Sequence, residues 1–414
     1  MSSLGKTLYP YCLWIKTLDI LDLQPLLLDL QSLLLDLQSL LLELLKVPDL
    51  RQKFYSPPLD YLDVLDKSNA TDSVDKPGSK ALLFEVTNEV TKYIKSVADQ
   101  GHGSAKLFCL QDPHLGYSTS SVYFPVWASR LASLTTLHVV DGSCVGDHIA
   151  LSLAENRPAF KHFGFERLSA GGEGKVVRFC EQLHPNTLES FNILEGPVVK
   201  CKALFQALDK HAQSLKELRL EYMTPRAFAS LDRLQNCTGL KTLGLRSYLA
   251  DESDATIWAS NHAPVYSRIV AWLQNCSQLK DLALLHLPSG SQLLQDVLKS
   301  PNVRLTDLCY KITEVATSWY TSLHHQQSLR SLEAEVDVLD LQNQGPVTGR
   351  CAGLAKGVSQ LPELQDLIVN EYFPPRTSKL SAKGQKSWKN MPRWNPDSRR
   401  ISHVTSETSV SKGP

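Results

Sequence analysis

Two short glycine groups could form phosphate-binding loops: Gly101-His-Gly103 and Gly171-Gly-Glu-Gly174. A phosphate loop needs G-x-x-x-x-G-K-S/T and a dinucleotide site needs G-x-G-x-x-G, and the sequence completes neither pattern. The metalloprotease pattern H-E-x-x-H and the hydrolase pattern G-x-S-x-G are also absent. We therefore interpret both glycine groups as turns, and we predict neither a cofactor nor a catalytic residue.

Histidine and cysteine side chains could hold a metal or act as nucleophiles. His324-His325 lies near the end of an expected helix, without a carboxylate or cysteine at the spacing of a zinc site. The nine cysteines are scattered, and the closest two are Cys180 and Cys201. Most fall near helix ends or beside strands, where a reduced cysteine packs as a small apolar residue. We predict no metal site and a reducing compartment, the cytoplasm or the nucleus.

Charged residues that recur at fixed places in a repeated leucine pattern are the remaining candidate site. The expected partner-binding residues on the concave face are Glu166, Glu217, Arg219, Glu221, Arg246, Asp281, Asp307, Lys311, Glu333, Glu335 and Asp366. Eight acids against three bases predict an acidic surface that attracts a basic protein partner. Two alternatives stay open: exposed strands need polar residues whatever they bind, and the basic C-terminal segment of the chain could occupy this surface.

The pattern that must position these residues is apolar-x-x-apolar-x-apolar. Two clear copies, LKELRLEY and LKTLGLRS, start 25 residues apart at Leu215 and Leu240. Good matches start at Ile15, Leu59, Leu134, Phe160, Leu188, Leu215, Leu240, Leu279, Leu329 and Leu364, and poorer ones at Leu107 and Leu305. A period of about 24 to 28 residues is typical of leucine-rich repeats.

One strand and one helix cannot bury their apolar faces alone, so each repeat must stack on its neighbours. Leu218 and Leu220 lie two residues apart and therefore point to the same face of a strand. The sequence predicts an α/β leucine-rich-repeat solenoid, with parallel strands on the concave face and helices on the convex face. The apolar residues of the pattern form its core.

The leucine-rich tract 26–46 repeats a heptad nearly three times and predicts a helix with a leucine seam. A bilayer span is disfavoured because Asp29, Asp36 and Glu43 would each oppose insertion by about 2.5 to 3.5 kcal/mol. We interpret the tract as an enlarged helix of the first repeat. A coiled-coil dimer remains open, and so does a self-associating or membrane-surface protein organised by this tract.

The rest of the chain follows the same organisation. A second strand is expected over Leu59–Val64, and the polar stretch 67–80 predicts a mobile loop. Insertions fall at Arg246–Pro264 and Gln342–Gly349. Helices are expected at 81–98, Val126–Ala132, Asp147–Glu155, Val176–Leu183, Val199–Lys210, Arg226–Leu234, Val265–Leu273, Ser291–Leu298, Val315–Leu323 and Cys351–Val358. Residues 1–370 are thus the solenoid, and 371–414 are a disordered basic tail.

Charge and composition exclude several classes of protein. The chain carries 43 basic and 43 acidic residues, so it lacks the overall charge of a nucleic-acid binder. We predict no nucleic-acid partner and no transmembrane segment, and the first residues lack the pattern of a secretory signal.

Three segments resemble the fungal F-box/leucine-rich-repeat proteins, a ribonuclease-inhibitor-like family. The repeat region opens with Ile15-Lys-Thr-Leu-Asp-Ile20, and two helices end as L-x-N-C, at Leu234–Cys237 and Leu273–Cys276. The resemblance implies that the repeats capture a substrate for a ubiquitin ligase, while an F-box docks a Skp-type adaptor. No Leu-Pro-x-Glu opening of an F-box precedes Ile15. The expected function is non-enzymatic protein binding, as the substrate-recognition part of such a ligase subunit without its F-box.

Overall fold

The structure is a computed structural model. It describes residues 17–19, 87–99, 109–111, 117–156, 160–194, 201–247, 263–311, 319–337 and 354–372, apart from positions 89, 97, 132, 170 and 288. The chain divides into two compact units, Met1–Tyr372 and Phe373–Pro414, and every described residue belongs to the first. The tract 26–46, the loop 67–80, Gly101–Gly103, the bulk of both insertions and residues 373–414 lie outside the described ranges.

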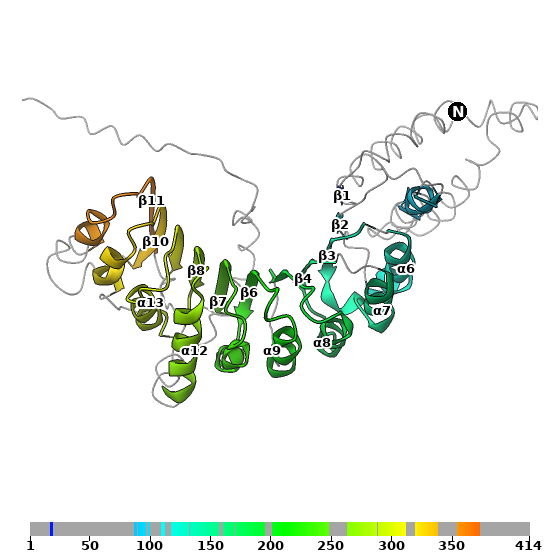
Figure 1. Ribbon diagram of the computed structural model, residues 1–414, viewed down its shortest axis with the longest axis horizontal. Helices are drawn as coiled ribbons and strands as arrows, with labels where there is room; N and C mark the ends of the chain where they lie inside the picture. The colour runs from blue at the N-terminus through cyan, green and yellow to red at the C-terminus, as the bar shows by residue number, and fades with distance from the viewer. Residues whose placement is uncertain are drawn as a thin grey trace, which may run out of the picture. The chain divides into compact units, whose positions relative to one another are not determined.

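The described residues form one eleven-stranded sheet in which every strand pairs in parallel with the next one along the chain (Figure 1). The strands are β1 Thr17–Asp19, β2 Cys109–Gln111, β3 Thr136–Asp141, β4 His162–Arg167, β5 Ser190–Ile193, β6 Glu217–Met223, β7 Thr242–Ser247, β8 Asp281–Leu285, β9 Asp307–Lys311, β10 Ser331–Asp337 and β11 Asp366–Tyr372. The fold is α/β with alternating strands and helices, which confirms this part of the prediction. The poorer matches at Leu107 and Leu305 precede β2 and β9.

One boundary differs from the sequence prediction. β1 pairs directly with β2, Thr17 with Cys109, and the strand expected over Leu59–Val64 lies outside the described residues. β11 extends to Tyr372 because its last residues pair with β10, so the first two residues of the expected tail belong to the sheet.

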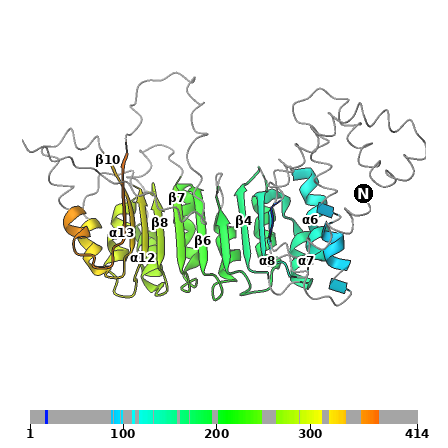
Figure 2. The same cartoon turned by 90° about the horizontal axis from the view of Figure 1, so that it is seen from above.

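Helices lie on one face of the sheet (Figures 1 and 2). They are α6 Tyr117–Arg130, α7 Asp147–Asn156, α8 Glu173–Gln182, α9 Cys201–Asp209, α10 Pro225–Ala229, α12 Ala263–Asn275 and α13 Gly290–Leu298. Three connections are 3-10 turns: η1 Gly142–Cys144, η2 Ser230–Leu234 and η3 Trp319–His325. Residues within 87–99 and 354–358 are also helical. The helices expected at Arg226–Leu234 and Val315–Leu323 are corrected in part, because each ends as a 3-10 turn.

The core lies between the sheet and the helices and is built from the apolar positions of the repeat. Leu218 and Leu220 are both buried, whereas Glu217 and Arg219 beside them are partly exposed. Phe163 packs on Phe179 of α8 with ring centroids 4.5 Å apart, so the strand of one repeat contacts its own helix. The alternation of buried and exposed strand residues confirms that the fourth and sixth pattern positions face the helices.

Gln326 is a buried polar residue that joins three backbone groups of the preceding repeat. Its side-chain oxygen accepts a hydrogen bond from Leu305 N at 2.9 Å. Its Nε2 donates to the carbonyls of Leu298 and Val303, at 2.9 and 3.1 Å. These groups lie where the chain passes from α13 to β9, so Gln326 fixes the connection between two stacked repeats.

No helix in the described ranges has the length and apolar character needed to cross a bilayer.

At the last strand, β11, the side chains of Leu367, Ile368 and Val369 are about half exposed. Within the described residues, no further strand pairs with the outer edge of β11.

We expect Gln326→Ala to lower the free energy of unfolding by about 1 to 3 kcal/mol, because it leaves buried backbone groups without partners. Gln327→Ala is the matched control. Gln327 is exposed, and its loss should change the free energy by less than about 0.5 kcal/mol. Urea unfolding followed by circular dichroism measures both. Equal losses in the two variants would contradict the proposed role of Gln326.

Candidate functional site

The face of the sheet opposite the helices, which we call the open face, carries the outward-pointing strand residues. Equivalent residues of successive strands pair in register and therefore form rows across the sheet. The first row contains Thr136, His162, Ser190, Glu217, Thr242, Asp281, Asp307, Ser331 and Asp366. The second contains His138, Gly164, Asn192, Arg219, Gly244, Ala283, Cys309, Glu333 and Ile368.

The structure brings most of the sequence-selected residues together on this face. Glu217, Asp281, Asp307 and Asp366 share the first row, and Arg219 and Glu333 lie in the second. The third outward position carries Arg246 and Lys311, which are in register through Leu285 of β8. Glu166 and Glu221 occupy the same position of β4 and β6. Glu335 lies in β10, but its side chain is outside the described set.

Glu217 is the centre of a hydrogen-bonded cluster on β5 and β6. Its carboxylate accepts hydrogen bonds from Ser190 Oγ at 3.2 Å and from Asn192 Nδ2 at 3.5 Å. Arg219 Nε lies 2.8 Å from the same carboxylate. Polar residues of two neighbouring strands therefore hold the Glu217 side chain in place.

Arg219 also extends over β7 towards β8, where its guanidinium lies 3.8 Å from the Asp281 carboxylate. Gly244 makes this possible because it is the residue of β7 that pairs with Arg219, and it has no side chain. A Cβ at position 244 would lie 3.3 Å from Arg219 Cγ. The glycine of β7 thus lets one arginine pair with acids on two strands that are not adjacent.

The acids around Arg219 outnumber it. Burial raises the pKa of the Asp281 carboxyl, and the neighbouring Asp307 and Glu217 carboxylates raise it further, against the opposing charge of Arg219. The result is a pKa above the usual range of an aspartate. The cluster of Glu217, Asp281 and Asp307 therefore carries negative charge that Arg219 does not fully compensate.

The other two bases of the open face are also paired with acids. Arg246 lies 3.4 Å from Glu221 and 5.1 Å from the centre of the Tyr222 ring, and Lys311 lies 3.4 Å from Glu333. The selected residues with described side chains comprise seven acids and three bases, a net charge of −4. These residues therefore carry more acidic than basic groups, and binding of a basic partner to them stays a prediction.

Cysteine and histidine side chains are the candidate nucleophiles and metal ligands of the sequence, and the structure describes the surroundings of Cys309 and His324. Cys309 lies on the open face with Sγ 3.4 Å from Glu333 Oε2. Burial, with the Glu333 carboxylate, raises the pKa of this thiol to about 12, so it is not a thiolate nucleophile at neutral pH. His324 Nδ1 lies 2.6 Å from the Thr321 carbonyl at the exposed end of η3. Across the described ranges, no group of three or more His, Cys, Asp or Glu residues could hold a metal.

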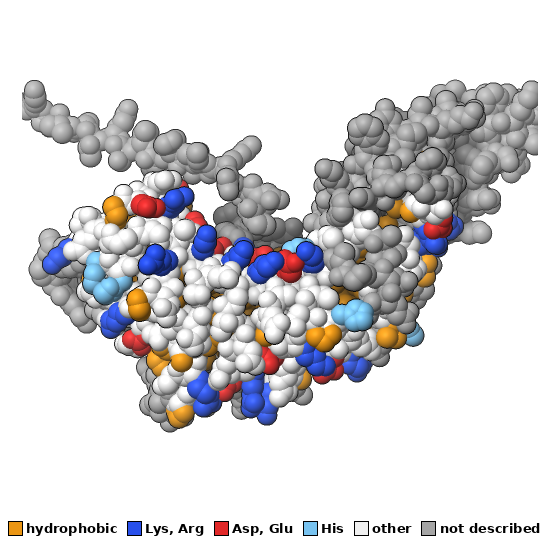
Figure 3. Space-filling view, in the orientation of Figure 1, with side chains coloured by type: hydrophobic (Ala, Val, Ile, Leu, Met, Phe, Trp, Pro, Cys, Tyr) orange, Lys and Arg blue, Asp and Glu red, His pale blue; other side chains and the backbone are white. Residues whose placement is uncertain are grey.

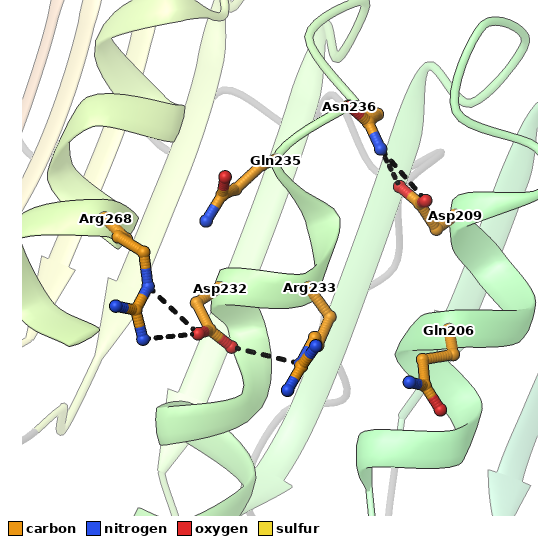
Figure 4. A pocket seen from close by; sticks show the side chains of 7 residues that line it. All are labelled: Gln206, Asp209, Asp232, Arg233, Gln235, Asn236 and Arg268. Carbon is orange, nitrogen blue, oxygen red and sulfur yellow. Dashed lines mark hydrogen bonds and ion pairs between the residues drawn. The ribbon is translucent and has the colours of Figure 1, made fainter.

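A polar hollow of about 530 Å³ lies on the helix side (Figure 4). It is lined by Gln206, Asp209, Asp232, Arg233, Gln235, Asn236 and Arg268. Asp232 pairs with Arg268 at 2.7 Å and with Arg233 at 3.8 Å. Asn236 donates to both oxygens of Asp209. The charged groups of the hollow mostly satisfy one another, and the lining holds neither a histidine nor a cysteine.

Comparison with known proteins adds no relative. No model of a protein family matches the sequence, and no curated protein matches it.

Sequence reasoning selected only charged residues and missed the uncharged members of the clusters. Ser190 and Asn192 support Glu217, and Gly244 gives Arg219 its path to Asp281. A signal for Gly244 was present, because a glycine interrupts the strand pattern at a solvent-facing position and marks a close approach of another group.

We expect Asp281→Asn to raise the free energy of unfolding at pH 7 by about 0.5 to 1 kcal/mol; the estimate is small because 36% of the side chain is exposed. The Asp281 carboxyl has a higher pKa in the folded protein than in the unfolded chain, where it is about 3.9. It therefore stabilises the fold when it is protonated, below about pH 3.9, and this stabilisation is lost as the pH rises through the folded-state pKa. The advantage of the Asp281→Asn variant over the wild type should accordingly disappear when the pH falls below both pKa values.

Thermal unfolding across the pH range measures this effect. Asp366→Asn, at the exposed end of the sheet, is the matched control and should change the stability at pH 7 by less than about 0.5 kcal/mol. A wild-type protein more stable than the Asp281→Asn variant at pH 7 would contradict the proposed excess of negative charge.

Proposed function

We propose that the open face binds a basic segment of a partner protein and that the chain acts as a protein-interaction module without catalytic activity. The observation that carries this proposal is the cluster of Glu217, Asp281 and Asp307 around Arg219. A lysine or arginine of a partner that enters this cluster would meet carboxylates already held in position. Such complementarity raises the rate of association and selects against acidic partners.

We further propose that the architecture is that of a leucine-rich-repeat solenoid, with the open face as its concave side. Three features support this assignment: the repeated apolar pattern, the alternation of one strand with one helical segment, and the parallel order of the sheet. In such solenoids each repeat contacts only its neighbours, and the strand side is a common binding surface. An extended partner segment could then contact several repeats at once.

The family-like helix ends support a more specific role, as the substrate-recognition part of an F-box-type ubiquitin ligase subunit. Cys237 and Cys276 are buried at these ends. Trp272 Nε1 donates to the Cys237 carbonyl at 3.2 Å, and the Cys276 thiol lies 3.6 Å from the same oxygen. The L-x-N-C residues therefore connect successive repeats. The five cysteines with described side chains are free thiols, which favours the cytoplasm or the nucleus.

We expect a twelve-residue peptide of alternating lysine and serine to bind the chain, and Asp307→Lys to weaken this binding on the order of tenfold. The substitution places a positive charge beside Asp281, where the partner's lysine would lie. Fluorescence anisotropy with a labelled peptide measures the dissociation constant. Binding should weaken further as salt is added, because exposed charges are screened.

Glu181→Lys is the matched control, since it makes the same change of charge on the exposed surface of α8. We expect it to alter the affinity for the basic peptide much less than Asp307→Lys does. Equal weakening by both variants would mean that only net charge matters, and the proposed site on the open face would be wrong.

Binding of the adaptor, which an F-box provides in the family that the chain resembles, has a separate test. We expect the 414-residue chain not to capture a purified Skp-type adaptor in a pull-down, because its sequence shows no F-box motif, whereas a characterised F-box protein in the same assay should capture it. Robust capture by the chain would mean that an adaptor-binding segment exists without the usual motif, contrary to our expectation.

A further inference from the structure

A further row of charged residues, separate from the rows of the open face, lies at the starts of the strands. Each of its residues directly precedes a residue of the first row. It consists of Lys161, Glu189, Lys216, Lys241, Lys280, Thr306, Arg330 and Gln365. In each repeat, the carbonyl of the row residue accepts hydrogen bonds from two backbone N–H groups of the next repeat. For Lys216 these come from Lys241 and Thr242, at 2.7 and 3.0 Å. The same bonding links every row residue from Lys161 to Gln365.

This backbone bonding fixes the spacing of the side chains at about 4.8 Å, the distance between paired strands. Five of the eight residues are basic and one is acidic, so we call this the basic row. The five basic residues are all exposed. Lys and Arg side chains form a visible line across the surface in Figure 3, with acidic side chains beside it.

Part of the basic row is neutralised within the molecule. Glu189 accepts from Lys161 at 2.8 Å and from Lys216 at 2.5 Å. These two hydrogen bonds lower the pKa of Glu189 to about 2, so it stays ionised across the physiological range. Arg330 lies 3.4 Å from Glu363. The carboxylates therefore cover both ends of the basic row.

The middle of the row is not neutralised. Lys241 follows Lys216 in the row, and Lys280 follows Lys241. Neither Lys241 nor Lys280 has an ion-pair partner among the described residues. Like charges on adjacent strands repel and destabilise the pair. A bound anion would relieve this repulsion, so the middle of the row is poised to accept negative charge.

We propose that the basic row binds an extended acidic segment of a protein, with carboxylates over Lys241 and Lys280. From Lys161 to Arg330 the row crosses six strand intervals, about 29 Å at the usual strand spacing. An extended peptide rises about 3.3 Å per residue, so about nine residues cover this length. Lysine side chains are flexible, so the acidic side chains need no strict match to the strand spacing.

The neighbouring residues favour a peptide over a nucleic acid. Asp281 and Asp307 of the open face follow directly after Lys280 and Thr306, and they would repel the phosphates of a broad duplex. Single strands are usually held by aromatic side chains that stack on the bases, and the basic row contains none. In an extended peptide successive side chains point to opposite sides, so carboxylates can face the row while the other side stays neutral.

The test uses a labelled twelve-residue peptide of alternating glutamate and serine, with fluorescence anisotropy of the full chain. Lys241→Gln combined with Lys280→Gln should weaken binding by about five- to tenfold. Lys202→Gln combined with Lys210→Gln removes the same charge from two exposed residues, one in α9 and one directly after it, and should change the affinity by less than twofold. Both pairs are exposed, and circular dichroism checks that each double variant is folded.

Three outcomes would overturn the proposal: no binding of the acidic peptide, equal weakening in both double variants, or tighter binding of an oligothymidylate of equal charge that is lost in the Lys241/Lys280 variant. The Asp307→Lys variant distinguishes binding of the acidic peptide to the basic row from binding of a basic partner to the open face. It retains the basic row, so it should still bind the acidic peptide even if the open face binds no basic peptide.

Discussion

Parallel pairing of each strand with the next, in one register, is the constraint on which the rest of the structure depends. The register holds from β2 to β11 for the first pattern positions. The apolar residues at the fourth and sixth positions of β3 to β10 are therefore buried in one layer against the helices. A shift by one residue would turn Leu218 outward and Glu217 inward. The burial of apolar side chains and the strand pairing therefore require each other.

The same register places charges in rows. Burial raises the pKa of the Asp281 carboxyl on β8, and the carboxylates of Asp307 on the adjacent β9 and of Glu217 on β6, two strands away, raise it further. One residue earlier, the same pairing aligns Lys241 with Lys280. The open face and the basic row thus carry opposite charge side by side.

Much of this arrangement was predictable from the sequence. The spacing of Leu215, Leu218 and Leu220 predicts a strand with a buried face, and its repetition predicts the parallel order. Spacing could not place Arg219 over Gly244, because this contact depends on which side chain is missing on the neighbouring strand. The basic row can be recognised in the sequence when the residue before each strand is compared across the repeats.

Cross-linking would test the location of binding most directly. A carbodiimide joins a lysine amine of a bound peptide to a carboxylate that it contacts, and mass spectrometry then identifies the modified residue. With the lysine–serine peptide, we expect cross-links at Glu217, Asp281 and Asp307. Cross-links confined to helix-side acids such as Glu181, with none on the open face, would contradict the account.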